Sequence, residues 1–494
     1  MIYPRKTVIV SFVVCLVMTM ICRAESVSPP EPLPPLPTAT QLAWENGDLA
    51  MYLNFGMGTF VGAEQGDGKE DPKLFNPARL DVRQWVKLAK ECGFKRIVLS
   101  VKNHDGFCLW PTATTKYSVA ASDWKDGHGD IVKEFTDACH EAGIEAGFYL
   151  SCEDRNNPAY GTPAYNQIYV GQLTELLSNY GQVGELRFDG AGGIGSGAMG
   201  SVDVPSPDRT QIYDWQSYFA TVRRLQPQTI MVSVVGPDAR WNGNNIGHAG
   251  DPIWSPFDLN SVPGPEPANQ NQLRVLNAGD PNGTTWLPPE SFVRLRPHWS
   301  WRAEDDTNVL ASDKLFNTYC KSVGRGCVLL LNVPLNRDGL IPEAETQRLR
   351  ELHSAITNMF ANDLAAGKHA TASNVRGNDP AFGADKALDD DAKTYWATDD
   401  SVTNNCWLEV DLNKPVRFDT LALREPVALG QRVAAYRIEA WQDGQWKLVV
   451  HGTSIGHLKL ERFNPVTTDK IRLVIEKSRA CPLISQFSLY LRQT

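Results

Sequence analysis

Short apolar runs alternate with amphipathic stretches from residue 41 to about residue 358. The apolar runs are typical of buried strands, and the intervening stretches carry apolar residues at helical spacing. In chain order the runs and stretches are 51–60, 81–93, 95–107, 130–143, 145–151, 165–181, 185–189, 213–227, 229–238, 311–326 and 327–336. Repeated strand-then-helix units predict an α/β fold with a parallel sheet. Because polar clusters follow nearly every strand, we expect a (β/α)8 barrel whose active site lies at that edge.

The pattern changes after the short linker NDLAAGKHA at 362–370. Short runs with alternating apolar and polar residues follow, separated by turn residues and without helical periods. These runs are 406–412, 418–425, 436–442, 445–451, 470–477 and 486–491. The sequence therefore predicts an all-β sandwich at 364–494 behind a barrel domain at 41–358.

The first residues have the features of a targeting segment. Arg5 and Lys6 precede an apolar stretch, and Ala24 ends it with a small residue suitable for cleavage. We expect a signal peptide at 1–24, followed at 25–40 by a Pro-rich linker that is extended and unstructured. The expected protein is secreted or periplasmic, without stable membrane insertion.

Composition narrows the classes of partner. The formal net charge of -9 argues against nucleic acid and fits a soluble protein that handles neutral ligands such as sugars. Eight of the ten cysteines lie outside the expected signal peptide, and the absence of CxxC pairs argues against a zinc site. Bridges from Cys320 to Cys327 or from Cys406 to Cys481 and buried free thiols are both compatible with this spacing. The chain contains no phosphate-loop or redox-cofactor motif.

The segment ELRFDGAGG at 185–193 is the first candidate for chemistry. A short apolar run that ends on Asp189 and breaks into glycine is typical of a buried strand that delivers its last side chain to an open rim. Asp189 is therefore the candidate nucleophile. The alternative is a carboxylate that only starts a turn, since Asp-Gly is a common turn dipeptide.

Several blocks of the barrel segment closely resemble the α-L-fucosidases of glycoside hydrolase family 29. These blocks are FGMGTFVGAEQGDGKEDPKLFNP, VKNHDGFCLWPTATTKYSV, FYLSCEDRNNPAYG, RFDGAGG, GPDARWNGN, WLPPESFVRLRPHW and GRGCVLLLNVPLNRDGLIP, in family order. The tail, through ALDDDAKTYWATDD and CWLEVDLNKPVRFDTLALRE, resembles the discoidin or coagulation factor 5/8 type C module, a jelly-roll sandwich.

The resemblance implies retaining hydrolysis of an α-L-fucosyl bond by a secreted enzyme that acts on fucosylated or related oligosaccharides and requires no cofactor. An aspartate attacks the anomeric carbon, and a second carboxyl about 5 Å away protonates the leaving oxygen and later activates water. The family's nucleophile falls on Asp189. Its acid/base glutamate, in a stretch of the form GPDxRWxGNE, falls on Asn245, and an amide cannot exchange that proton.

Other positions that the resemblance assigns to sugar binding also differ from the family. A histidine of the first strand is replaced by Asn54, the first of two paired histidines by Asn103, and a tryptophan by Gln65. The aromatic residue before FDG is Arg187, which would suit a substrate with an acidic substituent if it faced the sugar. The full set of expected substrate-binding residues is Asn54, Glu64, Gln65, Asn103, His104, Tyr149, Arg187 and Arg240.

Two interpretations follow from the missing glutamate. In the first, the chain is a hydrolase, with fucose or a related sugar as substrate, and another carboxylate supplies the acid. Glu153 is the tentative replacement because it stands at a strand end where the family carries tryptophan, whereas Glu290, Asp238 and Asp251 are weaker choices. In the second, the barrel has lost turnover and binds carbohydrate.

The tail has its own candidate site. Type C modules commonly bind terminal sugars and carry a structural calcium, which the resemblance places near Asp389 and Thr394, in line with the preference of calcium for oxygen ligands. The family's glutamate near the last strand is Gln486, which lowers the ligand charge. A sandwich that only supports the barrel is the alternative.

Overall fold

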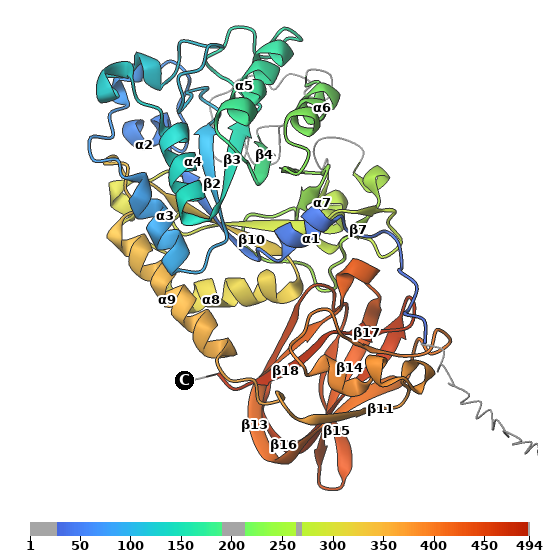
Figure 1. Ribbon diagram of the computed structural model, residues 1–494. Coiled ribbons are helices and arrows are strands. Elements are labelled where there is room, and N and C mark those ends of the chain that lie inside the picture. Colours follow the sequence, from blue (N-terminus) through green and yellow to red (C-terminus); the bar gives the residue numbers. More distant parts are fainter. Residues whose placement is uncertain (1–26, 190–212, 263–268, 493–494) are drawn as a thin grey trace, which may run out of the picture.

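The computed structural model describes residues 27–189, 213–262 and 269–492. It consists of a barrel with helices around it, followed by a sandwich of antiparallel strands (Figure 1).

Eight parallel strands close the barrel in the order β1-β10-β9-β6-β5-β4-β3-β2, which confirms the predicted (β/α)8 fold class. The strands are β1 (Leu49–Asn54), β2 (Arg96–Lys102), β3 (Glu145–Ser151), β4 (Glu185–Asp189), β5 (Ile230–Ser233), β6 (Ala239–Trp241), β9 (Pro289–Arg294) and β10 (Val328–Pro334). A parallel register places all their carboxyl ends at one edge, and that edge collects the polar residues discussed below.

The helices begin and end at residues that the sequence marks. In α3, Asp81 accepts hydrogen bonds from the first turn, and the apolar face is buried from Val82 to Ala89. In α4, Asp130 caps the start and Gly143 ends the helix in the left-handed conformation at φ 70°. The helices are α1 (Ala39–Glu45), α2 (Met57–Val61), α3 (Val82–Glu91), α4 (Ile131–Ala142), α5 (Tyr165–Asn179), α6 (Trp215–Leu225), α7 (Gln270–Ala278), α8 (Ser312–Lys321) and α9 (Glu343–Phe360).

One part of the barrel departs from regular strand-helix alternation. Strand β6 follows β5 without a helix between them, and the two-stranded sheet of β7 (Pro256–Phe257) and β8 (Thr285–Trp286) lies outside the barrel. The sequence pattern did not predict strands β6 and β9. The first of these is only three residues long, and the second contains a proline and two charged residues.

The tail folds into antiparallel sheets, as predicted. The main sheet has the order β11-β13-β16-β14-β15, with β18 paired to β13, while β12 pairs with β17. Along β13, Leu408, Val410 and Leu412 are buried while the residues between them face outward, so the alternation in the sequence corresponds to two faces. The strands are β11 (His369–Ala372), β12 (Trp396–Ala397), β13 (Cys406–Arg424), β14 (Val433–Gln442), β15 (Gln445–Gly452), β16 (Lys459–Ser478), β17 (Leu483–Ile484) and β18 (Gln486–Tyr490).

The sandwich packs against the amino-terminal edge of the barrel. His457 Nε2 lies 3.2 Å from Oδ1 of Asp48, the residue before β1, and Lys459 Nζ donates to Asp251 Oδ1 at 2.7 Å. Leu458 and Leu460 of the sandwich belong to the same buried apolar cluster as the barrel core. The contact therefore lies at the opposite edge from the carboxyl ends of the strands.

The Pro-rich segment corrects one expectation. Residues 27–38 form neither helix nor strand but are not unstructured, because the sandwich holds their main chain, and α1 begins at Ala39. Arg376 Nε donates to Ser28 O at 2.7 Å, Arg432 Nη2 donates to Glu31 O at 2.6 Å, and Leu33 N donates to a sandwich carbonyl at 3.0 Å. Hydrogen bonds from arginine side chains to main-chain carbonyls thus order a segment whose composition alone predicts no fixed structure.

The cysteines that the structure describes are all buried free thiols, so neither candidate bridge is formed. Within the described residues, no helix combines the length and the apolar character needed to cross a membrane.

Candidate functional site

The carboxyl ends of the first four strands bring several expected site residues together. Asn54 ends β1, Asn103 and His104 follow β2, and Glu153 follows β3 by two residues. Asn103 Nδ2 donates to Asn54 Oδ1 at 3.3 Å, which joins the first two strand ends. Asp189 is the last residue of β4, and its side chain lies outside what the structure describes.

The register between β3 and β4 positions the candidate nucleophile along the barrel edge. Ser151, the last residue of β3, pairs with Asp189 in the parallel ladder. Glu153 therefore stands just beyond the strand partner of Asp189, in the loop that leaves the same edge.

His104 is fixed by contacts with both ring nitrogens. Its Nδ1 lies 2.6 Å from Ser151 Oγ, and its Nε2 lies 3.4 Å from the hydroxyl of Tyr149. All three residues are buried at the ends of β2 and β3. The sequence pointed to His104 and Tyr149 but missed Ser151, since a serine at a strand end carries no signal of its own.

Glu153 is buried and paired with a guanidinium that the sequence did not single out. Arg155 Nε donates to Glu153 Oε1 at 2.7 Å, and His104 Nδ1 lies 4.0 Å from Glu153 Oε2. Arg155 also donates to Gln65 Oε1 at 2.9 Å and to Gly66 O at 3.0 Å, so it joins the loops after β1 and β3. A neighbouring positive charge favours the ionised carboxylate.

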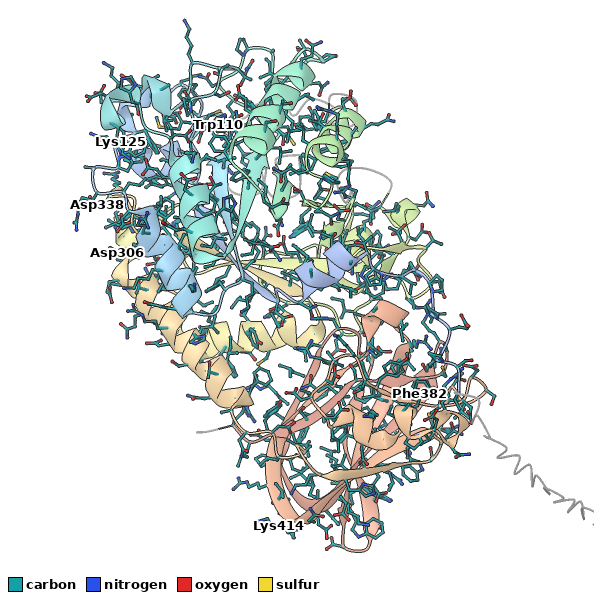
Figure 2. All side chains as sticks on the ribbon, viewed as in Figure 1. Trp110, Lys125, Asp306, Asp338, Phe382 and Lys414 are labelled. Carbon is teal, nitrogen blue, oxygen red and sulfur yellow. The ribbon has the colours of Figure 1, made fainter. Side chains whose placement is uncertain are left out.

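A buried network joins the end of β2 to the loop after β3. Lys102 Nζ, at the end of β2, donates to the hydroxyl of Tyr165 at 2.7 Å and lies 3.7 Å from Asp154 Oδ2, directly after Glu153. The Tyr165 hydroxyl in turn donates to Asp154 Oδ2 at 3.1 Å. Further along, Trp110 (Figure 2) donates its Nε1 to Glu175 of α5 at 2.8 Å. The positions of His104 and Glu153 are therefore set by residues outside the site.

Glu64 is held from the other side of the barrel. Its Oε2 accepts from Trp299 N at 2.7 Å, and Arg294 Nη1, at the end of β9, lies 4.0 Å from its Oε1. The Arg294 guanidinium lies over the Trp299 ring at 5.3 Å, and that ring packs on Phe292. The sequence pointed to the block WLPPESFVRLRPHW as a whole but did not single out Arg294 or Trp299.

Arg187 points into the barrel interior and forms an ion pair with Glu290 of β9. Both side chains are buried, and the guanidinium also lies over the Phe292 ring at 4.9 Å. Because the carboxylate of Glu290 offsets the charge of Arg187, an acidic sugar would have to compete with Glu290 for this guanidinium. A contact of Arg187 with substrate stays a prediction.

Arg240 is buried away from this group, whereas Asn245 lies in the loop that follows β6 at the carboxyl edge of the barrel. Arg240 is fully buried, its guanidinium donates to the carbonyls of Leu276, Leu287 and Trp254, and burial lowers its pKa to about 9. Those contacts use its donors inside the protein, so the structure does not place it where a sugar could reach it. Asn245 is exposed and accepts a hydrogen bond from Trp241 Nε1 at 3.1 Å.

The two remaining candidate acids also have structural partners. Asp238 accepts from Met231 N at 2.8 Å and pairs with Arg223. Asp251 lies at the contact between barrel and sandwich, where ion pairs with Lys459 and Arg325 offset burial and lower its pKa. Among these alternatives to Asn245, Glu153 alone stands with His104 at the strand ends.

The tail residues expected near calcium lie close together. Thr394 Oγ1 lies 2.7 and 2.8 Å from the carboxylate oxygens of Asp389, 3.4 Å from Lys386 O and 3.2 Å from Asp391 O. Convergent oxygens of this kind suit calcium. The ammonium group of Lys386, whose Nζ lies 3.3 Å from Asp389 Oδ2, would compete with calcium for that carboxylate. Within the described residues, no cluster of three or more His, Cys, Asp and Glu side chains is suited to a metal. Calcium remains a prediction.

Comparisons with known proteins match both parts of the chain. The family model described as alpha-L-fucosidase matches residues 55–356, and the F5/8 type C domain model matches residues 369–487. Alpha-L-fucosidase 1 of Arabidopsis thaliana is 38% identical over 482 residues, which covers 96% of this chain and 91% of the relative.

Solved structures agree with this match. A glycoside hydrolase 29 family member from an unknown rumen bacterium has a TM-score of 0.81 and 33% identity, covering 94% of this chain and 78% of that one. A Ruminococcus gnavus family 29 fucosidase, solved in complex with fucose, has a TM-score of 0.83 and 28% identity, covering 95% of this chain and 97% of that one.

Proposed function

The chain belongs to the alpha-L-fucosidase family of glycosidases, and we propose that it hydrolyses α-L-fucosyl bonds by double displacement with Asp189 as the nucleophile. The substrate class is a fucosylated oligosaccharide, and no cofactor takes part. The observation that carries the proposal is the position of Asp189 at the carboxyl end of β4, in register with Ser151 of β3 and beside the loop after β3 that carries Glu153, while His104 after β2 contacts both Ser151 and Glu153. A rigid strand end restricts a carboxylate to one approach toward a sugar.

The second carboxyl in this proposal is Glu153. Its burial, its distance of 4.0 Å from His104 and its place next to the β4 edge support that role. Arg155 favours its ionised form, and an ionised carboxylate can accept a proton from water but cannot give one to a leaving group. Glu153 is therefore better prepared for the second half of the reaction, in which the sugar leaves Asp189, than for the first.

The chemistry then depends on the leaving group. In the first half, Asp189 forms a bond to the anomeric carbon as the glycosidic bond breaks, and an aryl leaving group departs without a proton. In the second half, water donates its proton to Glu153, adds to the anomeric carbon and releases Asp189. We expect faster turnover of aryl α-L-fucosides than of unactivated fucosyl oligosaccharides.

The direct test replaces the nucleophile by its isosteric amide. Asp189→Asn should lower kcat/KM on an aryl α-L-fucoside by at least about 10³-fold, because no covalent intermediate can form. Asp238→Asn, which changes a carboxylate at the amino-terminal edge of the same barrel, serves as the matched control. Unchanged cleavage in Asp189→Asn would show that the nucleophile is elsewhere.

The role of Glu153 is tested by two further variants. Glu153→Gln should accumulate the fucosyl-enzyme on an activated aryl fucoside, visible as added mass, and azide should restore turnover by replacing activated water. Arg155→Met should raise activity on unactivated fucosides relative to aryl fucosides by about tenfold, since loss of the guanidinium makes protonation of Glu153 easier. Equal effects on both substrate types would argue against Glu153 as the acid/base.

A second candidate function is a barrel that binds fucosylated glycans without turnover. The exposed amide of Asn245 at the family's acid/base position favours it. Fucose binding without turnover of any aryl α-L-fucoside would support this alternative. A substrate with an acidic substituent is less favoured, because Glu290 neutralises Arg187.

We also propose that the protein is exported to the periplasm or outside the cell, on the basis of the targeting segment. Residues 1–24 lie outside the described part of the chain. Amino-terminal sequencing of the exported protein should begin after Ala24.

A further inference from the structure

The outward face of the main sandwich sheet carries tryptophans near a hairpin. Trp441 of β14 and Trp446 of β15 are directly opposed in the ladder, with ring centroids 5.2 Å apart and planes at 66°. Trp441 is 36% exposed, and Leu448, two residues along β15 on the same face, is 54% exposed. These residues are the large exposed apolar side chains of this sheet, and Figure 1 shows β15 on the side of the sandwich away from the barrel.

The aromatic pair is held in place by charged neighbours on the same face. The Arg472 guanidinium lies over the Trp446 ring at 4.2 Å and donates through Nε to Glu439 Oε2 at 2.5 Å. Arg437 donates to the other oxygen of Glu439 at 2.8 Å and to Glu476 Oε1 at 3.0 Å. Two guanidinium groups and two carboxylates therefore alternate beside the rings, and their charges cancel.

A third tryptophan extends the face across the sheet. Register places Trp407 of β13 opposite Val474 of β16, which faces Arg437 of β14. Trp407 is partly exposed and lies on the same side of the sheet as Glu439 and Arg472. The outward face thus consists of aromatic rings at two places with neutralised charge pairs between them.

We propose that this face, formed by Trp407, Trp441, Trp446 and the ion pairs of Arg437 and Arg472 with Glu439 and Glu476, binds a neutral oligosaccharide chain. The electron-rich face of an aromatic ring attracts the C–H bonds on one side of a sugar ring. Fixed carboxylate and guanidinium groups accept from and donate to hydroxyls. Because the charges on the face cancel, it complements an uncharged polyol rather than a nucleic acid, an anionic lipid surface or a sulfated glycan.

The position of the face defines what its ligand does. The sandwich contacts the amino-terminal edge of the barrel, whereas the candidate catalytic residues lie at the carboxyl-terminal edge. A glycan bound to the tryptophans is therefore a separate segment from the bond at Asp189. The site acts as an anchor that keeps the chain near its polymeric substrate, and it does not depend on turnover in the barrel.

The test is native affinity electrophoresis of the full chain carrying Asp189→Asn, in gels that contain xyloglucan, galactomannan or xylan, one polysaccharide per gel. At least one should retard the protein, and excess free L-fucose should leave that retardation in place because it competes only at the barrel. Trp441→Ala and Trp446→Ala should each raise the Kd at least about tenfold, while Trp441→Phe should retain most of the affinity.

Leu448→Ala is the matched control, since it removes an exposed apolar side chain from the same face without removing a ring, and it should change the Kd less than about twofold. Absence of retardation by any of the three polysaccharides overturns the proposal, as does wild-type binding by both alanine variants. Retardation only by a sulfated polysaccharide would indicate an anion site instead. A concentration-dependent dimer that Trp441→Ala abolishes would identify a second copy of the chain as the occupant and would also overturn it.

Discussion

The barrel interior and the outward face of the sandwich both contain arginine–glutamate pairs, but in different environments. The side chains of Arg187 and Glu290 are 6% and 0% exposed, whereas those of Arg472 and Glu439 are 20% and 12% exposed. A fully buried pair must stay intact, because loss of one partner leaves an uncompensated charge away from water. A pair with access to water tolerates that loss and can hydrogen-bond a ligand. Burial therefore decides whether the same two residue types act as structure or as a binding surface.

We expect the largest change in the free energy of unfolding from Arg187→Met, which breaks the fully buried pair. The substitution leaves Glu290 buried beside Phe292 without its guanidinium, and we expect a loss of about 3–5 kcal/mol in the free energy of unfolding. Urea unfolding of the full chain measures it. The double variant Arg187→Met/Glu290→Gln should recover most of the loss, and equal destabilisation of single and double variants would contradict the role of the buried charge.

An intermediate effect should come from Glu45, a buried carboxyl with neutral hydrogen-bond donors. Trp286 Nε1 and Ser255 Oγ lie 3.3 and 3.4 Å from its oxygens, and burial raises its pKa to about 7. The folded protein thus keeps a proton that the unfolded chain releases near pH 4.5. Its contribution to stability is complete below that pH and is lost as the pH rises through about 7.

Glu45→Gln should remove this dependence. The wild type should lose up to about 3 kcal/mol relative to the variant between about pH 5 and about pH 8, since one pKa unit corresponds to about 1.4 kcal/mol. Thermal or urea unfolding at several pH values gives the difference. Glu425 has a pKa raised to about 7 by burial as well and is unchanged in both proteins, so parallel curves would rule out Glu45 as the titrating group.

The smallest effect should come from Glu439→Gln on the sandwich face. Water can replace the carboxylate beside Arg437 and Arg472, so we expect a loss of at most about 1 kcal/mol in unfolding free energy. Urea unfolding under the conditions used for Arg187→Met allows direct comparison. A loss as large as that of Arg187→Met would remove the distinction between the two environments.

Much of the fold could be predicted because periodicity reports burial directly. Alternation of apolar runs and amphipathic stretches predicted the barrel, and period-two runs predicted the sandwich. Short or charged strands such as β6 and β9 were missed, because β6 has only three residues and β9 contains a proline and two charged residues. The Pro-rich segment was expected to be free, since its partners Arg376 and Arg432 lie several hundred residues away.

The candidate site could be predicted only in part, because motifs report residue positions along the chain and not the contacts between distant residues. Motif positions identified His104, Glu153 and Tyr149, and the structure brings them together at adjacent strand ends. Motifs could not identify Ser151 or Arg155, whose importance lies in what they contact.

By itself the sequence determined most strands of the barrel, the change from strand–helix units to all-β runs, and which polar residues follow those strands, because these features depend on near neighbours along the chain. Only the tertiary structure decided which charges meet. Arg187 pairs with Glu290, Glu153 with Arg155, and Trp441 with Trp446. Such pairings depend on strand order, register and loop placement, which bring distant residues into contact. The solvent exposure of each pair then decides whether an arginine and a glutamate stabilise the interior or can bind a ligand at the surface.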